Sequence, residues 1–130
     1  MQFSSRRFTD VVVAAPVGRI DHLNAGPFEE ALRPVLEQSG ISKEALVLDF
    51  SGVEYISSVG LRVLMAAAKQ AQAHESKIAV AGLQSIVAEI FAISRFNRIL
   101  DVYPSVPAAL AKLSAPALEA FNAAKDRPVT

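Results

Sequence analysis

Two adjacent hydroxyls, those of Ser57 and Ser58, occupy the position in this chain that most favours chemistry. They follow a short loop after an apolar run and precede a helical pattern, so they stand where a helix begins. One such Ser is explained as an N-cap, worth about 1 kcal/mol, because its oxygen accepts a hydrogen bond from a free backbone N–H. A cap uses only one hydroxyl, and the free N–H groups and the helix dipole also favour a phosphate there. The pair therefore predicts either a cap alone or a cap beside a phosphorylation site.

A hydrolytic interpretation joins Ser58 to His22 and Asp21, because a serine nucleophile needs a histidine base and an acid that orients it. The sequence around Ser58 is I-S-S-V-G, so the G-x-S-x-G nucleophile elbow is absent. The Gly-rich sequences that cradle phosphates in nucleotide-binding proteins are absent too. His74 stands near the polar end of a helical pattern, where we expect it to be solvated. The hydrolytic interpretation predicts activity on a generic ester that disappears in the His22→Ala variant.

Composition narrows the possible partners. The chain has 130 residues, a length typical of one domain, and its 13 Lys plus Arg balance 13 Asp plus Glu. A formal net charge of zero argues against a non-specific nucleic-acid binder. The absence of Cys excludes disulfides and thiolate ligands, and the two His residues lack metal-ligand spacing, so we expect no metal site.

The N-terminal residues lack the apolar core of a secretory signal. The longest strongly apolar stretch, residues 63–68, is far too short to span a bilayer. We therefore expect a cytoplasmic protein that makes no membrane contact.

The elements that position the two hydroxyls alternate between apolar runs and one-sided helical patterns. Strands are predicted at 11–17, 45–50, 77–81 and 99–103, with residues 2–9 able to pair with the first as a hairpin. Helices are predicted from Pro27 to Gly40, from Val59 to His74, around 86–91 and over 105–113. Gly40 is expected to end the first helix in a left-handed cap, and Pro34 is expected to kink it.

Strands separated by helices require crossover connections, which place helices over a mostly parallel sheet. We predict a single α/β domain over residues 1–114, with a mixed sheet of about five strands and about four helices. Residues 115–130 are Ala-rich and are expected to form a helical extension followed by a loose tail from Lys125. Packing over the sheet edge, self-association and disorder remain open for this extension, and so does the oligomeric state.

The sequence from Asp49 to Leu64, D-F-S-G-V-E-Y-I-S-S-V-G-L-R-V-L, closely resembles the signature of the STAS domain, as found in bacterial anti-sigma factor antagonists. The G-R-I-D sequence at 18–21 is similar to the Gly-x-Leu-Asp turn of that family. The segments 81–91 and 96–100 resemble the end of the same domain. Together the resemblance covers residues 5–113 and implies a STAS-like fold.

The resemblance implies a regulatory switch with no enzyme activity of its own. In such proteins, a Ser at the start of the second helix is phosphorylated by a partner that is both an anti-sigma factor and a serine kinase of GHKL type. The unmodified form binds this partner and releases the sigma factor, the phosphorylated form does not bind, and a PP2C-type phosphatase reverses the modification. Since the kinase partner supplies ATP and Mg²⁺, we expect no bound cofactor on this chain. By position in the motif this Ser is Ser58. The family commonly has Asp where Ser57 stands, so Ser57 is a second candidate.

The resemblance also implies a set of residues that contact the partner. The second helix is apolar almost all round from 61 to 68. A helix with this pattern is either packed inside the protein or covered by a partner. Arg62 lies one turn after Ser58 and can contact the partner, contact the phosphate or simply be solvated. STAS-like domains also serve as fixed structural partners, for instance of transport ATPases, without phosphorylation, and this is the alternative function. The expected partner-binding residues are Asp21, Ser57, Ser58, Val59, Gly60 and Arg62.

Overall fold

The computed structural model describes residues 1–125, which form a six-stranded sheet and five α-helices. Apart from Lys125, the predicted loose tail lies outside the described residues. None of the helices in the described part of the chain is long and apolar enough to cross a membrane. In chain order the elements are β1 (Gln2–Phe8), β2 (Val11–Ile20), α1 (Ala25–Ser42), β3 (Ala45–Asp49), β4 (Val53–Ile56), α2 (Ser58–Ala73), β5 (Ile78–Ala81), α3 (Ser85–Ile93), the 3₁₀ turn η1 (Phe96–Arg98), β6 (Asp101–Tyr103), α4 (Val106–Leu113) and α5 (Ala115–Lys125).

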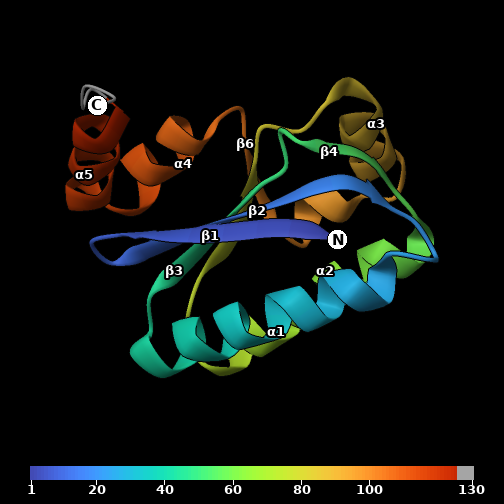
Figure 1. Ribbon diagram of the computed structural model, residues 1–130, viewed down its shortest axis with the longest axis horizontal. Coiled ribbons are helices and arrows are strands. Elements are labelled where there is room, and N and C mark those ends of the chain that lie inside the picture. Colours follow the sequence, from blue (N-terminus) through green and yellow to red (C-terminus); the bar gives the residue numbers. More distant parts are fainter. Residues whose placement is uncertain (126–130) are drawn as a thin grey trace.

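The sheet is mixed, with strand order β1-β2-β3-β5-β6. β1 and β2 form the predicted antiparallel hairpin, and the remaining pairs are parallel, which confirms the predicted sheet type. Helices cover both sides of this sheet: α1 and α2 lie below it in Figure 1, whereas α4 and α5 lie on the opposite side.

Alternation along the strands divides the core between these two sides. Val12 and Ala14 of β2 pack in the cluster that contains the buried residues of α1 and α2. Val11 and Val13 point the other way and pack in the cluster that contains α4 and α5. Both faces of β2 are therefore apolar, as is typical of a strand covered on both sides.

The prediction of about five strands missed β4. After pairing with β3, β2 changes register at Gly18 and Arg19, and its last residues pair in parallel with β4. Gly18 has a φ of +106°, a conformation that favours glycine, and its N–H donates to the carbonyl of Gly52 at 2.9 Å. The bulge thus lets one long strand serve two partners, and only the second partner leads into α2.

The predicted end of the first helix is wrong. α1 runs through Pro34 and past Gly40 to Ser42, and Lys43 takes the left-handed C-cap conformation at φ +56°. Gly40 is used for packing instead, because a Cβ at this position would lie 3.2 Å from the His74 ring. The two helices of this layer therefore meet closely at their C-terminal ends.

The extension after residue 114 is helical up to Lys125 and packs on the N-terminal hairpin. The ring of Phe121 in α5 contacts Phe8 edge-on, with a centroid distance of 5.3 Å. Ser114 caps α5 by accepting from the N–H of Ala117 at 3.2 Å, and its hydroxyl donates to Asp10 at 2.5 Å. These contacts tie α5 to the turn between β1 and β2.

Candidate functional site

The site lies where the parallel strands β2 and β4 end side by side. The N–H of Ser57, just after β4, donates to the carbonyl of Ile20, the last residue of β2, at 2.8 Å. Carboxyl ends of parallel strands meet at the same edge of a sheet, so this bond places the Ser57-Ser58 turn beside the Asp21 turn. The β2–β4 pairing therefore brings these two motifs together.

The two serines have different structural roles. Ser57 is the N-cap of α2: its backbone is extended, at φ −87° and ψ 172°, and its Oγ accepts from the N–H of Gly60 at 3.2 Å. Ser58 is the first residue of the helix and is exposed, and none of the side-chain hydrogen bonds among residues 1–125 involves its hydroxyl. Ser57 thus provides the helix cap, and its neighbour Ser58 is the candidate for phosphorylation. Of the two hydroxyls, only that of Ser58 is free and faces solvent.

This division predicts unequal effects on stability. Ser57→Ala is expected to lower the free energy of unfolding by about 1 kcal/mol, because the N–H of Gly60 loses its acceptor. Ser58→Ala is expected to change it by less than about 0.5 kcal/mol, because its hydroxyl holds nothing in place. Urea denaturation of both variants measures the difference. Equal losses, or a larger loss for Ser58→Ala, would show that the cap has been assigned to the wrong residue.

Gly60 fixes how closely α2 approaches the strand ends. It is buried, and a Cβ at this position would lie 2.8 Å from the side chains of both Ile20 and Ile56 and 3.1 Å from the Ile20 carbonyl oxygen. Only glycine fits without displacing one of these neighbours. Gly60 was expected at the partner surface. It is instead buried between α2 and the strand ends, where it positions the Ser57-Ser58 turn and offers no side chain to a partner.

Asp21, another expected partner contact, is engaged within its own turn. Its Oδ1 accepts from the N–H groups of Leu23 and Asn24, both at 3.1 Å, and its Oδ2 lies 3.9 Å from Arg19 Nε. The carboxylate thus shapes the turn that connects β2 to α1. Asp21 is half-buried, so part of its side chain remains accessible to solvent.

The hydrolytic constellation does not form. His22 is exposed, and in the described part of the chain it makes no hydrogen bond to Ser58 or to Asp21. A triad needs both of those bonds to activate the hydroxyl and orient the ring. Residues 1–125 also contain no group of three or more His, Cys, Asp and Glu side chains arranged to hold a metal ion.

The fold agrees with comparisons to known proteins. Residues 2–109 match the family model described as the STAS domain. This chain belongs to the STAS domain family. The match covers every strand of the sheet and both motifs of the site.

Several proteins similar to this STAS domain are named anti-sigma factor antagonists. BtrV of Bordetella bronchiseptica, named as a candidate anti-sigma factor antagonist, is 31% identical over 111 residues, which cover 85% of this chain and 93% of that protein. The anti-sigma-B factor antagonist of Listeria monocytogenes is 29% identical over 96 residues, covering 74% of this chain and 82% of that protein. The crystal structure of an anti-sigma factor antagonist from Mycobacterium paratuberculosis is 25% identical and superposes with a TM-score of 0.76, covering 86% of this chain and 92% of that one.

The surface around Ser58 in this STAS domain contains exposed apolar side chains. Val59, the next residue along α2, is 39% exposed, and Leu23, in the Asp21 turn, is 73% exposed. Leu23 was missed in the sequence, although a Leu within the polar turn D-H-L-N is a usable signal for a contact surface. Arg62 is exposed one turn after Ser58. Apolar groups beside a free hydroxyl and a cation are the composition of a protein-binding surface.

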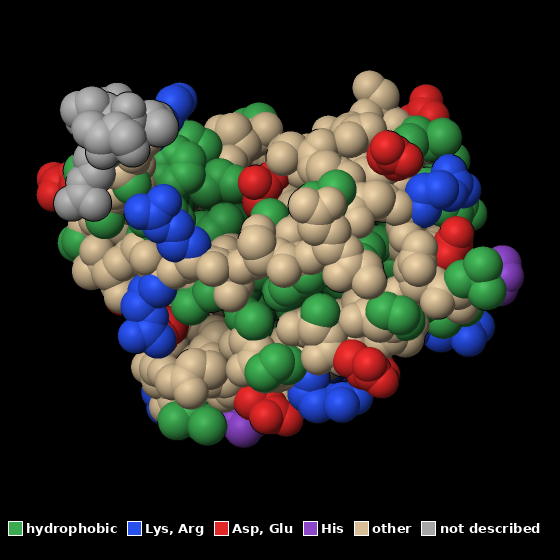
Figure 2. Space-filling view, in the orientation of Figure 1, with side chains coloured by type: hydrophobic (Ala, Val, Ile, Leu, Met, Phe, Trp, Pro, Cys, Tyr) green, Lys and Arg blue, Asp and Glu red, His purple; other side chains and the backbone are tan. Residues whose placement is uncertain are grey.

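Charge is mixed on one broad face of the STAS domain. On the face drawn in Figure 2, basic and acidic side chains are interspersed around the periphery and apolar groups lie between them. This distribution differs from the continuous basic stripe typical of nucleic-acid binding proteins.

Proposed function

We propose that this STAS domain is a cytoplasmic anti-sigma factor antagonist that is switched off by phosphorylation of Ser58. The observation that carries the proposal is the exposed, unengaged Ser58 hydroxyl at the first turn of α2, beside a serine that already provides the cap. The names of the relatives, which cover most of this chain, support the anti-sigma factor as the partner. Ser57 is the weaker candidate for modification, because its Oγ is already an acceptor for the helix N-terminus.

The covalent chemistry belongs to the partner. An anti-sigma factor of the GHKL kinase type would supply ATP and Mg²⁺, and this chain would supply only the acceptor. The Ser58 oxygen forms a bond to the γ-phosphorus, the bond from that phosphorus to the bridging oxygen of ADP breaks, and the hydroxyl proton is released. A PP2C-type phosphatase would restore the hydroxyl by hydrolysis and release inorganic phosphate.

The physical consequence of the modification is local. A phosphate adds a charge of about −1.5 to −2 and three acceptor oxygens. At the N-terminus of α2 this charge faces free N–H groups and the positive end of the helix dipole, so the fold tolerates it. A partner surface formed around a neutral hydroxyl instead meets a bulky, strongly hydrated anion. The switch therefore needs no refolding of the STAS domain.

The function is tested by sigma factor release. The GHKL anti-sigma factor from the same genome is loaded with its sigma factor, and the unmodified chain is added at increasing concentration. Release of the sigma factor, measured by size-exclusion chromatography or by recovered transcription, is the expected result. Failure to displace any sigma factor, together with stable recovery of a transport ATPase from cell extract, would contradict this function and favour the structural-partner alternative.

A further inference from the structure

A groove follows the seam between α1 and α2 and begins beside the Ser58 turn. Its first part is lined by Val59 and by residues of the first turns of α1, and its second part continues along both helices as far as Gln70. The two parts share Glu29 and Val63, so they form one continuous depression. The groove therefore connects the candidate phosphorylation site to the middle of the α1–α2 layer.

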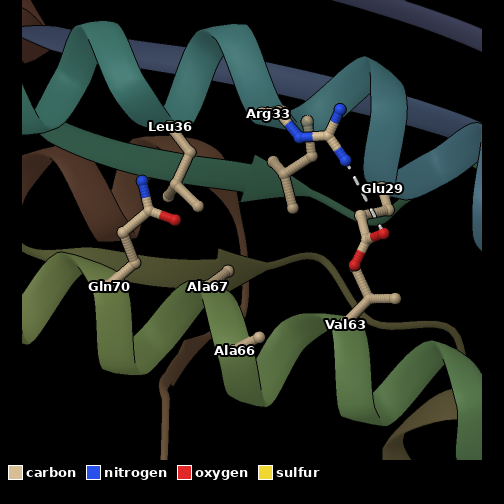
Figure 3. A pocket seen from close by; sticks show the side chains of 8 residues that line it. Glu29, Arg33, Leu36, Val63, Ala66, Ala67 and Gln70 are labelled. Carbon is tan, nitrogen blue, oxygen red and sulfur yellow. Dashed lines mark ion pairs between the residues drawn. The ribbon is translucent and has the colours of Figure 1, made fainter.

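Small side chains create this groove. Figure 3 shows Glu29 of α1 reaching toward Val63 at one end and Gln70 of α2 reaching toward Leu36 at the other. Between these two contacts, α2 presents only the methyl groups of Ala66 and Ala67. Since Ala67 is buried and Ala66 is exposed, the floor is closed while the notch above it is open to solvent. Its floor is apolar, formed by Ala67 with Leu32 and Leu36 of α1, and suits an aliphatic side chain.

The charges along the groove leave one cation without a partner. Arg33 is matched by Glu29 on the same helix, at 3.8 Å. Arg62, in the part nearest Ser58, takes part in no ion pair within residues 1–125. The unpaired cation of the groove lining is therefore Arg62, at the end next to the candidate site.

We propose that this groove binds a segment of the anti-sigma factor that places an aliphatic side chain over Ala66 and a carboxylate against Arg62. The proposal rests on the proposed function and extends the contact surface from the Ser58 turn along α2 as far as Gln70. The proposal also explains why a single phosphate is enough to prevent partner binding. A phosphate on Ser58, one turn from Arg62, competes for the Arg62 guanidinium and repels the partner's carboxylate.

The test fills the notch without touching Ser58. Ala66→Leu adds an aliphatic side chain at an exposed position, and Ala111→Leu adds the same group at an exposed position of α4, on the opposite side of the sheet. Ala66→Leu is expected to weaken binding to the ADP-bound GHKL anti-sigma factor about tenfold, with an unchanged melting temperature. Ala111→Leu is expected to change neither quantity.

The role of the Arg62 charge is tested by Arg62→Gln. This variant is expected to bind the anti-sigma factor more weakly than the unmodified native chain. The additional loss of affinity caused by Ser58→Asp is expected to be smaller in Arg62→Gln than in the native background. Unchanged affinity in Ala66→Leu would overturn the groove proposal. If Ala66→Leu changed the molecular mass measured by light scattering but left the affinity for the anti-sigma factor unchanged, the groove would be an interface with a second copy of this chain. That result would overturn the groove proposal as well. In both cases sigma factor release by the native chain would still stand, whereas no binding by the native chain would refute the proposed function itself.

Discussion

Phosphorylation of Ser58 is expected to weaken binding to the anti-sigma factor about 100-fold, equivalent to about 3 kcal/mol. The hydroxyl is exposed at the start of α2, next to the exposed apolar side chain of Val59, so a phosphate would stand within the contact surface. The partner would then have to strip water from a charged group of about −2 or leave a gap around it. Isothermal titration calorimetry of the modified and unmodified chains against the same anti-sigma factor measures the change.

Matched variants separate charge from loss of the hydroxyl. Ser58→Ala is expected to bind within about threefold of the native chain, because its hydroxyl makes no hydrogen bond in the described residues. Ser58→Asp carries a smaller charge than phosphate and is expected to fall between the two. The melting temperature should not fall on phosphorylation, since a negative charge at a helix N-terminus stabilises it by about 0.3–1 kcal/mol. Equal affinity of the phosphorylated and unmodified chains would contradict the switch.

Substitution of Gly60 by Ala is expected to lower the free energy of unfolding by about 1–3 kcal/mol. The added Cβ would lie 2.8 Å from both Ile20 and Ile56, so α2 or the ends of β2 and β4 must move. Because this contact holds the Ser58 turn against the sheet, weaker binding to the anti-sigma factor should accompany the loss of stability. Urea denaturation and calorimetry on the same preparation measure both quantities.

Gly26 provides the control for this substitution. It lies in the first turn of α1, and a Cβ there would meet nothing within 4 Å. Gly26→Ala is therefore expected to keep or raise stability, by up to about 1 kcal/mol, because alanine loses less backbone entropy in a helix than glycine does. Similar destabilisation of both variants would show that the close approach at Gly60 has no energetic importance.

The sheet was largely predictable because its strands have strong patterns, and the exception has a clear cause. The run of β-branched residues at 11–17 marks most of β2, and the apolar run at 45–50 marks β3. β4 has only four residues, V-E-Y-I, too few to establish an alternation. Its pairing depends on the bulge at Gly18, which no local pattern announces.

The residues of the candidate site could be selected from the sequence, but their structural roles could not. The I-S-S-V-G sequence indicates a helix start with a spare hydroxyl, yet which Ser is the cap depends on where α2 begins, and helix boundaries are uncertain from sequence by a residue or more. Asp21 was selected only as a partner contact, and its second role, in which one oxygen accepts from two backbone N–H groups of its own turn, was not predicted. The α1–α2 groove depends on how two helices distant in sequence pack, so no single segment predicts it.

Site mapping by tandem mass spectrometry tests the central claim most directly. The native chain, Ser58→Ala and Ser57→Ala are each incubated with the GHKL anti-sigma factor, ATP and Mg²⁺, and the phosphate is located in the peptide that contains both serines. We predict one phosphoryl group on Ser58 in the native chain and in Ser57→Ala, and none in Ser58→Ala. Phosphate on Ser57 in the native chain, or undiminished labelling of Ser58→Ala, would contradict the assignment of the switch to the exposed hydroxyl.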